Sequence, residues 1–313
     1  ERGAHEGRSP DMFAVSLRLA DAIPHDPHRR GIYVTRLMEF ASCPIYYYLH
    51  YIAGWSSETL KEMGIGLYPQ TSDKPSARSA ATAFGKAIHK LLEMYPPAAG
   101  AMTKEEIVSL TLDDESSLSS EERSALKEEI LKVWDRIQTK PFMKILDDAA
   151  ERLEERKFQI CLERHVLAGR VDLLYRDKSG FWSVIDYKTG RVFPGSLTIK
   201  AERYRLQMDA YGVFLSRFAP EQDHWDVTLA FVEEGEHFTK QYTRQSLAST
   251  IQNLVALMDQ EDAFHKAMTR PVNAAPAQPT AMFDEHCPKC DRSKLAECTF
   301  RSSVEKMLAI EQA

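Results

Sequence analysis

The chain has 313 residues, of which 43% are hydrophobic and 10% aromatic, and its formal net charge is −6. This composition is ordinary for a globular protein of one large or two modest domains, so a sizeable hydrophobic core is expected. No run of about 18 apolar residues occurs, and the first thirty residues lack the apolar centre of a signal peptide, which predicts a cytoplasmic protein without a membrane span. The negative charge argues against a generally basic surface, so any contact with nucleic acid must be local.

The beginning of the chain mixes charged residues and prolines without a sustained period. We interpret residues 1–31 as an arm or a linker. Because the chain begins with Glu1 and not with methionine, we expect it to be part of a longer protein. Ordered structure is expected from about Ile32, followed by a helix with an N-cap at Thr35 that runs towards the aromatic stretch CPIYYYLHYIAGW.

Two further helices are predicted before the pattern changes. One covers residues 80–95, with apolar residues on one side. The other follows Ser119 and Glu122, which form a capping-box signature, and continues to Ile137. After it, the apolar period changes from helical to strand-like.

The second half of the chain predicts strands and two more helices. Three segments rich in Val, Ile, Leu, Phe and Tyr are predicted to form an antiparallel meander: 157–163, 168–176 and 181–188. A helix over 200–218, a strand in HWDVTLAFVEE and a long helix over 244–267 complete the predicted order. A Pro/Ala-rich linker then leads to a cysteine-rich end.

The stretch GRVDLLYRDKSGFWSVIDYKTG, residues 169–190, places two aspartates and a lysine on one predicted hairpin. If the turn is centred on Ser179, Asp172 and Asp186 lie opposite each other, with Cβ atoms about 4.5–5.5 Å apart. Asp186 and Lys188 are two residues apart on a strand and so point to the same face. A divalent cation would relieve the repulsion of the carboxylates, and the set suits metal-assisted phosphodiester hydrolysis. A solvated surface hairpin is the alternative, against which the apolar neighbours of these charges argue.

These residues resemble a known family. GRVD, followed by DYKTG with its aspartate fourteen residues after the first, is similar to the RecB-type branch of the PD-(D/E)xK nuclease superfamily. The resemblance covers residues 32–300 and implies an α/β fold with a restriction-endonuclease-like core over about 80–265. In that core a central mixed β-sheet with an antiparallel meander is flanked by helices. A helical N-terminal segment and a Cys-rich C-terminal segment are added to the core, and residues 301–313 form a tail.

The resemblance also implies roles for individual residues. FGKAIHKLLE is similar to a family helix whose histidine binds metal, which assigns that role to His89. Asp172, Asp186 and the carbonyl of Tyr187 would be the other ligands of Mg²⁺ or Mn²⁺, and Lys188 would position the attacking water. A packed or surface histidine is the alternative interpretation of His89 taken alone.

Two more motifs flank the hairpin. EERKF resembles the family's E-x-x-F, which gives Glu155 a supporting role in the site, with Glu154 and Glu163 as competing candidates. YRLQMDAYGVFL resembles Q-x-x-x-Y, so Gln207 and Tyr211, one helical turn apart, would help to position the DNA strand and the active-site groups. Core packing is the alternative for Tyr211.

Four of the five cysteines suggest a second metal site. Cys43 stands early in the chain, and Cys287, Cys290 and Cys298 stand near its end, a layout that in a cytoplasmic protein favours metal ligands over disulfides. It resembles RecB-like nucleases of the AddB and CRISPR-associated types, in which one early and three late cysteines bind a [4Fe–4S] cluster. Segment 283–300 would then pair with Cys43 and close a loop around the core. The gap between Cys290 and Cys298 is longer than the family's usual spacing, and a structural zinc fits the same thiolates.

Cys161 stands on a predicted strand and is interpreted as a packed apolar residue. As a whole, the resemblance implies a DNA nuclease, an exonuclease on DNA ends or single strands, acting in recombination and repair as the C-terminal domain of a helicase–nuclease. No Walker-type loop occurs, so the helicase module would lie elsewhere in the same chain or in a partner chain. A free-standing CRISPR-associated nuclease that trims spacers, a non-catalytic DNA clamp and a redox-sensing scaffold that binds a protein are the alternatives.

Overall fold

The computed structural model describes residues 31–62, 75–95, 101–190, 192–193 and 195–269. The strands in this part of the chain form one mixed sheet. They are β1 (Gly31–Tyr33), β2 (Glu151–Leu162), β3 (His165–Arg176), β4 (Trp182–Lys188), β5 (His224–Phe231) and β6 (Glu236–Thr243). The helices are α2 (Val34–Ser42), α3 (Pro44–Tyr47), the π-helical η1 (Tyr48–Ile52), α4 (Ser57–Glu62), α5 (Pro75–Glu93), α6 (Lys104–Asp113), α7 (Ser120–Ile137), α8 (Met143–Asp148), α9 (Leu197–Glu202), α10 (Arg205–Phe218) and α11 (Arg244–Met268).

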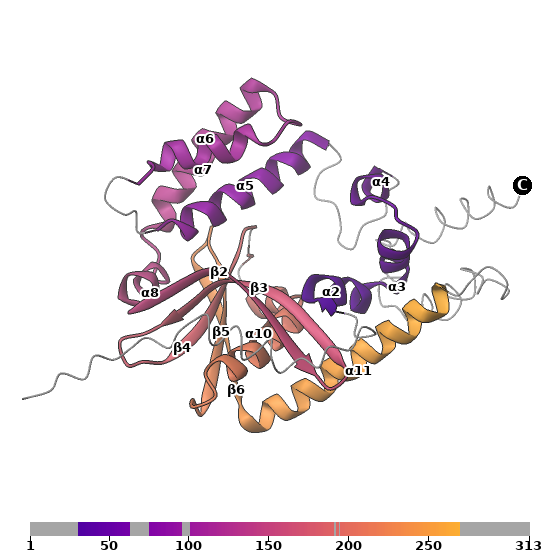
Figure 1. The fold of residues 1–313 in the computed structure, drawn as a ribbon. Helices are drawn as coiled ribbons and strands as arrows, with labels where there is room; N and C mark the ends of the chain where they lie inside the picture. Colours follow the sequence, from indigo (N-terminus) through magenta and orange to yellow (C-terminus); the bar gives the residue numbers. More distant parts are fainter. Residues whose placement is uncertain (1–30, 63–74, 96–100, 191, 194, 270–313) are drawn as a thin grey trace, which may run out of the picture.

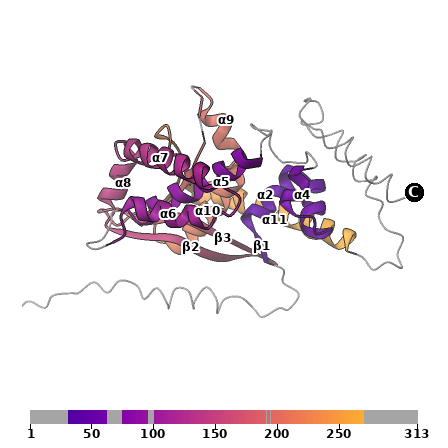
Figure 2. The same ribbon diagram turned by 90° about the horizontal axis from the view of Figure 1, so that it is seen from above.

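Helices cover both faces of the sheet (Figure 1, Figure 2). One buried cluster joins α10, α2 and α11 to the sheet through residues such as Leu174 and Val184. The other joins α5 to α8 to the opposite face through Leu173 and Ile185. Because alternate residues of a strand point to opposite faces, adjacent residues of β3 and β4 serve the two cores. This is the predicted α/β arrangement, a mixed central sheet flanked by helices.

The register of the predicted hairpin is confirmed. Leu173 pairs with Ile185, and Arg176 pairs with Trp182, so the turn between β3 and β4 is centred on Ser179. Asp177 begins this turn, and its Oδ1 accepts hydrogen bonds from the backbone N–H groups of Ser179 and Phe181. Such a side-chain bond to the backbone two residues on is typical of aspartate in turns.

Strand β3 is forked at one edge. Along its other edge it pairs with β2 over its whole length. At the forked edge β1 pairs in parallel with residues 166–168, whereas β4 pairs in antiparallel fashion with residues 173–176. Within the part of the chain that the structure describes, residues 169–172 therefore have no strand partner on this edge. Their polar backbone groups need other partners, which makes the gap a natural place for a polar site.

The buried side of β2 and β3 also changes at this gap. Leu167 and Val171, two odd-numbered residues of β3, face the core around α10, but further along the strand the even-numbered Leu174 does so. Strand β2 changes in the same way at Glu155, whose φ is +52°. The pairs on both sides of Glu155 keep one register, so Glu155 stands opposite Asp172 at the point where both strands turn over.

Several elements differ from the prediction. Strand β1 is too short to show a period, β6 has mostly polar exposed residues, as an edge strand does, and α6 is a short helix behind its own capping box at Thr103; none of the three was predicted. Strand β2 begins six residues before the predicted segment, within the charged run ERLEER, because these residues pair with β3. The helix predicted over 200–218 is divided into α9 and α10.

The predicted helix boundaries are partly right. The capping box of Ser119 and Glu122 at the start of α7 is confirmed. The N-cap of α2 is Tyr33, which makes no side-chain cap, and the predicted cap Thr35 lies in the first turn of the helix. Across the described segments, no helix combines the length and the apolar character that crossing a membrane requires.

Candidate active site

Helix α5 brings His89 to the end of β4. At Gly85, one turn before His89, a Cβ atom would lie 3.2 Å from Oγ1 of Thr189, so the missing side chain lets the helix approach the end of the strand closely. The imidazole lies edge-on to the ring of Tyr187, 5.9 Å between centroids, and also hydrogen-bonds to the backbone of Tyr187. Burial lowers the pKa of His89, so the ring is neutral at neutral pH, which is the form that binds metal ions.

Asp172 lies in the gap of the sheet, directly beyond the last pair of the hairpin. Its Oδ2 accepts a hydrogen bond from the backbone N–H of Tyr187 at 2.7 Å and lies 3.5 Å from Nδ1 of His89. The carboxylate thus accepts the hydrogen bond that a backbone carbonyl of β3 would accept if the pairing with β4 continued. Burial, with the negative charge of Asp186 nearby, raises the pKa of Asp172 well above its ordinary value of 3.8. The predicted repulsion between the two aspartates is therefore present in the fold.

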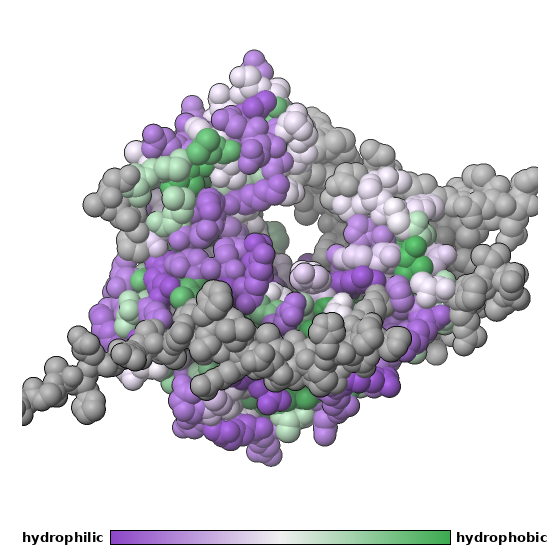
Figure 3. Space-filling view, in the orientation of Figure 1, coloured by the Kyte–Doolittle hydropathy of each residue, from purple (hydrophilic) through white to green (hydrophobic). Residues whose placement is uncertain are grey.

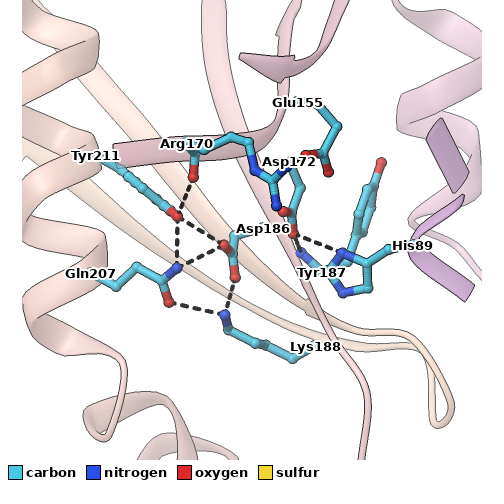
Figure 4. A network of polar contacts seen from close by, with 9 residues as sticks. All are labelled: His89, Glu155, Arg170, Asp172, Asp186, Tyr187, Lys188, Gln207 and Tyr211. Carbon is cyan, nitrogen blue, oxygen red and sulfur yellow. Dashed lines mark hydrogen bonds and ion pairs between the residues drawn. The ribbon is translucent and has the colours of Figure 1, made fainter. Parts of the chain in front are cut away.

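Asp186 is the centre of a buried polar network (Figure 4). It is 2% exposed, and its Oδ2 lies 2.5 Å from Nζ of Lys188. Gln207 joins the two residues: its Nε2 donates to Oδ1 of Asp186 at 3.1 Å, and its Oε1 accepts from Lys188 at 2.9 Å. Burial alone would lower the pKa of Lys188, but the adjacent Asp186 outweighs it and the pKa is raised, so the amine is charged at neutral pH.

Tyr211 ties this network to the gap in the sheet. Its hydroxyl lies 2.6 Å from Nε2 of Gln207 and 3.2 Å from Oδ1 of Asp186, and it also lies 2.8 Å from the carbonyl oxygen of Arg170. That carbonyl belongs to the stretch of β3 that has no strand partner at the forked edge. The side chain of Tyr211 thus satisfies a backbone group that the fork leaves unpaired, in addition to packing in the core.

Glu155 is the glutamate that the fold brings to the site. One ligand-capable atom each of His89, Glu155 and Asp172 lies within 4.8 Å of the others. Of the competing candidates, Glu154 pairs with Arg152 at 2.9 Å, and Glu163 stands in the turn between β2 and β3. One imidazole nitrogen and two carboxylate oxygens form a donor set that suits a divalent cation.

The predicted set of metal ligands is thus brought together only in part. His89 and Asp172 lie side by side, and the backbone of Tyr187 is at the same place. The carboxylate of Asp186 is directed towards Lys188, Gln207 and Tyr211, and it is not among the three groups that approach within 4.8 Å. The third member of that group, with His89 and Asp172, is Glu155, which was predicted only as a supporting residue.

A cleft of about 700 Å³ opens onto this centre. It runs from His89 across the gap in β3 to the start of α2, and Figure 3 shows the surface hollowed between the helices α5–α7 and α2–α4. Besides Lys188, its charged lining consists of Arg156, Lys157 and Arg170 and of the aspartates at the centre. The exposed ring of Tyr33 also lines the cleft. No sequence motif marks Tyr33, whereas Lys157 stands within EERKF and Arg170 within GRVD.

The cysteine prediction is covered only at its N-terminal part. Cys43 caps α3, with its Sγ accepting from the backbone N–H of Tyr46 at 3.4 Å. Cys161 lies on β2 and is partly buried. Cys287, Cys290 and Cys298, the linker before them and the arm over 1–30 lie outside the described residues.

Comparisons with known proteins agree with this geometry. None of the curated protein sequences matches the chain. A crystal structure of a proposed exonuclease from Eubacterium rectale is similar in fold, with a TM-score of 0.50 and 10% identity over 87% of this chain and 89% of that one. A crystal structure of SSO0001 matches with a TM-score of 0.31 and 13% identity over 91% and 94% of the two chains, which is too distant to carry weight. Residues 34–299 match the family model of the PD-(D/E)XK nuclease superfamily, and the chain therefore belongs to that superfamily.

Proposed function

We propose that this protein is a metal-dependent deoxyribonuclease that acts on DNA ends or single strands. The observation that carries the proposal is the buried pair of Asp186 and Lys188, which lies beside His89 and Asp172 where the sheet forks and faces an open cleft. A buried ion pair that lies next to a second carboxylate is costly for a fold, which favours a catalytic reason for it. Membership of a nuclease superfamily supports hydrolysis of a phosphodiester.

The donor set fits a divalent cation such as Mg²⁺ or Mn²⁺. The side chains that would hold it are those of His89, Glu155 and Asp172. Asp186, which the sequence motif also assigns as a ligand, would have to turn towards the ion from its pairing with Lys188. When bound, the cation would supply stabilisation of negative charge on the phosphate and a lowered pKa of the attacking water. Since Lys188 is protonated, its Nζ acts as a donor that orients the water and faces the charge developing on the phosphate. Gln207 holds that amine in place.

The lining of the cleft supports a nucleic-acid strand as substrate. The chain has a net charge of −6, but among the described residues that line the cleft the only acids are Asp172 and Asp186, and the remaining charged side chains are basic. Basic side chains along a cleft track a phosphate backbone, and an exposed aromatic ring gives a base a face to stack on. Lys157 and Tyr33 fit these two roles, because both are exposed and both line the cleft.

Replacing Tyr33 by alanine is expected to weaken binding of single-stranded DNA by about tenfold, since stacking of one base is worth roughly 1–3 kcal/mol. The ring is 63% exposed, so the fold should be unaffected. Fluorescence anisotropy with a labelled oligothymidylate, with Ca²⁺ in place of Mg²⁺, measures the effect. Phe193, which is 70% exposed and does not line the cleft, provides the matched control as Phe193→Ala. Equal losses in both variants would contradict the stacking role.

Replacing Tyr211 by phenylalanine is expected to destabilise the fold by about 1–3 kcal/mol, because it leaves the buried carbonyl of Arg170 without its partner. Cleavage should also slow by about tenfold, since Gln207, whose Nε2 donates both to this hydroxyl and to Asp186, loses one of the two acceptors that orient it. Tyr242→Phe is the matched control, because that hydroxyl donates to Asp209 on the same helix α10, away from the cleft. Urea unfolding and initial cleavage rates distinguish the two: a rate in Tyr211→Phe as high as in Tyr242→Phe would exclude the positioning role.

We also propose the finer assignment that the sequence motifs support, a RecB-like nuclease domain of a cytoplasmic repair or recombination enzyme that works with a helicase module. Cys43 with Cys287, Cys290 and Cys298 would bind a [4Fe–4S] cluster, with zinc as the alternative. Absorbance near the thiolate-to-iron bands and iron and zinc analysis of anaerobically purified protein decide between them. Cys43→Ser protein that retains its full metal content would exclude Cys43 as a ligand.

Digestion of end-labelled single-stranded and duplex DNA, with Mg²⁺ and with EDTA, tests the activity itself. We expect cleavage that requires Mg²⁺ or Mn²⁺ and that is faster on single strands or frayed ends. The order in which labelled products appear reports the polarity. Tight binding without cleavage in either metal would contradict the nuclease proposal and favour a DNA clamp.

A further inference from the structure

Glu155 has an unusual backbone conformation, and its carboxylate has a second partner besides the candidate metal ligands. A left-handed φ of +52° at a residue other than glycine costs about 1–2 kcal/mol, and this one lies inside a long strand. The conformation directs the carboxylate towards His89 and Asp172, but Oε2 lies 2.5 Å from Nη1 of Arg170. A guanidinium therefore occupies one oxygen of a group that also belongs to the candidate metal ligands.

Arg170 is built to serve two partners. Its carbonyl is held by Tyr211 in the gap of the sheet, so the backbone is fixed to the polar network. Its side chain is 58% exposed and lines the cleft, so the guanidinium can turn away from Glu155 without unfolding anything. The planar guanidinium of arginine binds phosphate oxygens through two parallel hydrogen bonds, a geometry that lysine lacks.

The charges at the centre make the exchange favourable. With its carboxylates ionised, the centre has three acids, Glu155, Asp172 and Asp186, facing two cations, Arg170 and Lys188. The net charge is therefore −1 without metal and +1 once a divalent cation enters. With the metal ion bound, the guanidinium of Arg170 is repelled by it. An incoming phosphodiester carries one negative charge, which balances the net charge of +1 at the centre.

We propose that Arg170 is a positioning residue with two alternative partners: it pairs with Glu155 while the centre holds no metal, and it turns to a phosphate oxygen of the bound strand when a divalent cation takes Glu155. The phosphate partner rests on the proposed nuclease function, but the competition with metal does not. Arg170 thus links metal loading to substrate binding, and in the metal-free protein it offsets part of the negative charge of the centre.

Binding of Mn²⁺ to the protein without DNA tests the first half. Arg170→Gln should bind Mn²⁺ about threefold to fivefold more tightly than wild type in calorimetric or spin-resonance titration, because Glu155 loses a competing cation. Lys157→Gln is the matched control: Lys157 is the cross-strand partner of Arg170, lines the same cleft and carries the same charge, but does not pair with Glu155. We expect its Mn²⁺ affinity to stay near wild type. In a Glu155→Gln background, Arg170→Gln should add nothing.

A weaker or unchanged Mn²⁺ affinity in Arg170→Gln, or the same gain in Lys157→Gln, would overturn the proposal. Loss of a nearby positive charge by itself also favours a cation, and Lys157→Gln measures that general effect, so a gain confined to Arg170→Gln is diagnostic of competition for Glu155. This readout stands whether or not the protein cleaves DNA, so failure of the nuclease function and failure of the exchange are distinguished.

Binding of a labelled oligothymidylate in Ca²⁺ tests the second half. Arg170→Gln should weaken it by about tenfold when the metal is present and much less in EDTA, because the guanidinium reaches the phosphate only after metal has taken Glu155. Lys157→Gln should weaken binding equally with and without metal. Arg170→Lys should keep the wild-type Mn²⁺ affinity yet recover DNA affinity only in part. Equal losses for Arg170→Gln in Ca²⁺ and in EDTA would refute the metal-linked exchange.

Discussion

Replacement of Lys188 by methionine is expected to reduce DNA cleavage by about 10³-fold, at the upper end of what a positioned proton-donating side chain contributes. The amine is held by Asp186 and Gln207 in the network and stays charged, so no other described side chain can take its place beside Asp186. Methionine keeps the length and the apolar stem of the side chain. DNA binding in Ca²⁺ should therefore remain within about threefold of wild type, since the cleft keeps its other cations.

The control for this variant is Lys240→Met. Lys240 pairs with Asp209 at 2.7 Å, so the substitution breaks a comparable lysine–aspartate pair outside the cleft. Single-turnover cleavage of a labelled strand, with circular dichroism to confirm folding in Mg²⁺, compares the two variants. Lys188→Met leaves Asp186 without its cation and should lose about 3–5 kcal/mol of stability in EDTA. A cleavage rate within tenfold of wild type would show that Lys188 is not part of the reacting centre.

Asp172→Asn is expected to stabilise the metal-free protein while it abolishes Mg²⁺-dependent activity. The pKa of Asp172 is raised in the folded state above its ordinary value of 3.8 by burial and by Asp186, so the ionised carboxylate opposes folding. Wild-type stability should thus fall as pH rises from about 4 towards neutrality in EDTA, and the variant should lack this part of the fall. Asparagine can still accept the hydrogen bond from the N–H of Tyr187.

Thermal unfolding in EDTA and in Mg²⁺ measures how Asp172 lowers the stability of the metal-free protein and raises that of the metal-bound protein. At neutral pH without metal, the variant should melt roughly 2–5 °C above wild type. Saturating Mg²⁺ should raise the melting temperature of wild type through binding to the folded state, and should raise that of the variant much less. A variant that is less stable than wild type in EDTA throughout this pH range would contradict the view that the two aspartates repel each other.

Much of the site followed from the sequence because strand geometry is local. The turn at Ser179 fixes the register of the hairpin, and with it the approach of Asp172 and Asp186. The helical spacing of Gln207 and Tyr211 predicts that they share a face, and both contact Asp186. A motif spaced along one strand or one helix is therefore informative even before its surroundings are known.

The parts that were missed depend on contacts distant in sequence. The fork of β3 arises because β1, more than a hundred residues earlier, takes one half of an edge whose other half belongs to β4. The left-handed Glu155 and its pairing with Arg170 follow from that fork, and no local pattern marks them. The less exposed positions of strand β6 are Phe238, Lys240 and Tyr242, and because one of them is a lysine the alternation of a half-buried strand was not readable from its residues.

The cleft joins these elements into one account of function. The metal ligands, the network around Asp186 and the basic lining come from α5, β2, β3, β4 and α10, and they meet at the gap in the sheet. The buried charge cluster and the strained backbone of Glu155 destabilise the fold at this place, as is common at catalytic and ligand-binding sites.

The measurement that tests this account most directly is cleavage of one end-labelled single strand by wild-type, Lys188→Met and Asp172→Asn proteins, purified side by side and assayed in Mg²⁺. We predict a product ladder with wild type and an intact strand with both variants, while all three bind the strand in Ca²⁺. Cleavage at similar rates by all three preparations would show that any nuclease activity comes from elsewhere and that the centre at the fork of the sheet is not catalytic.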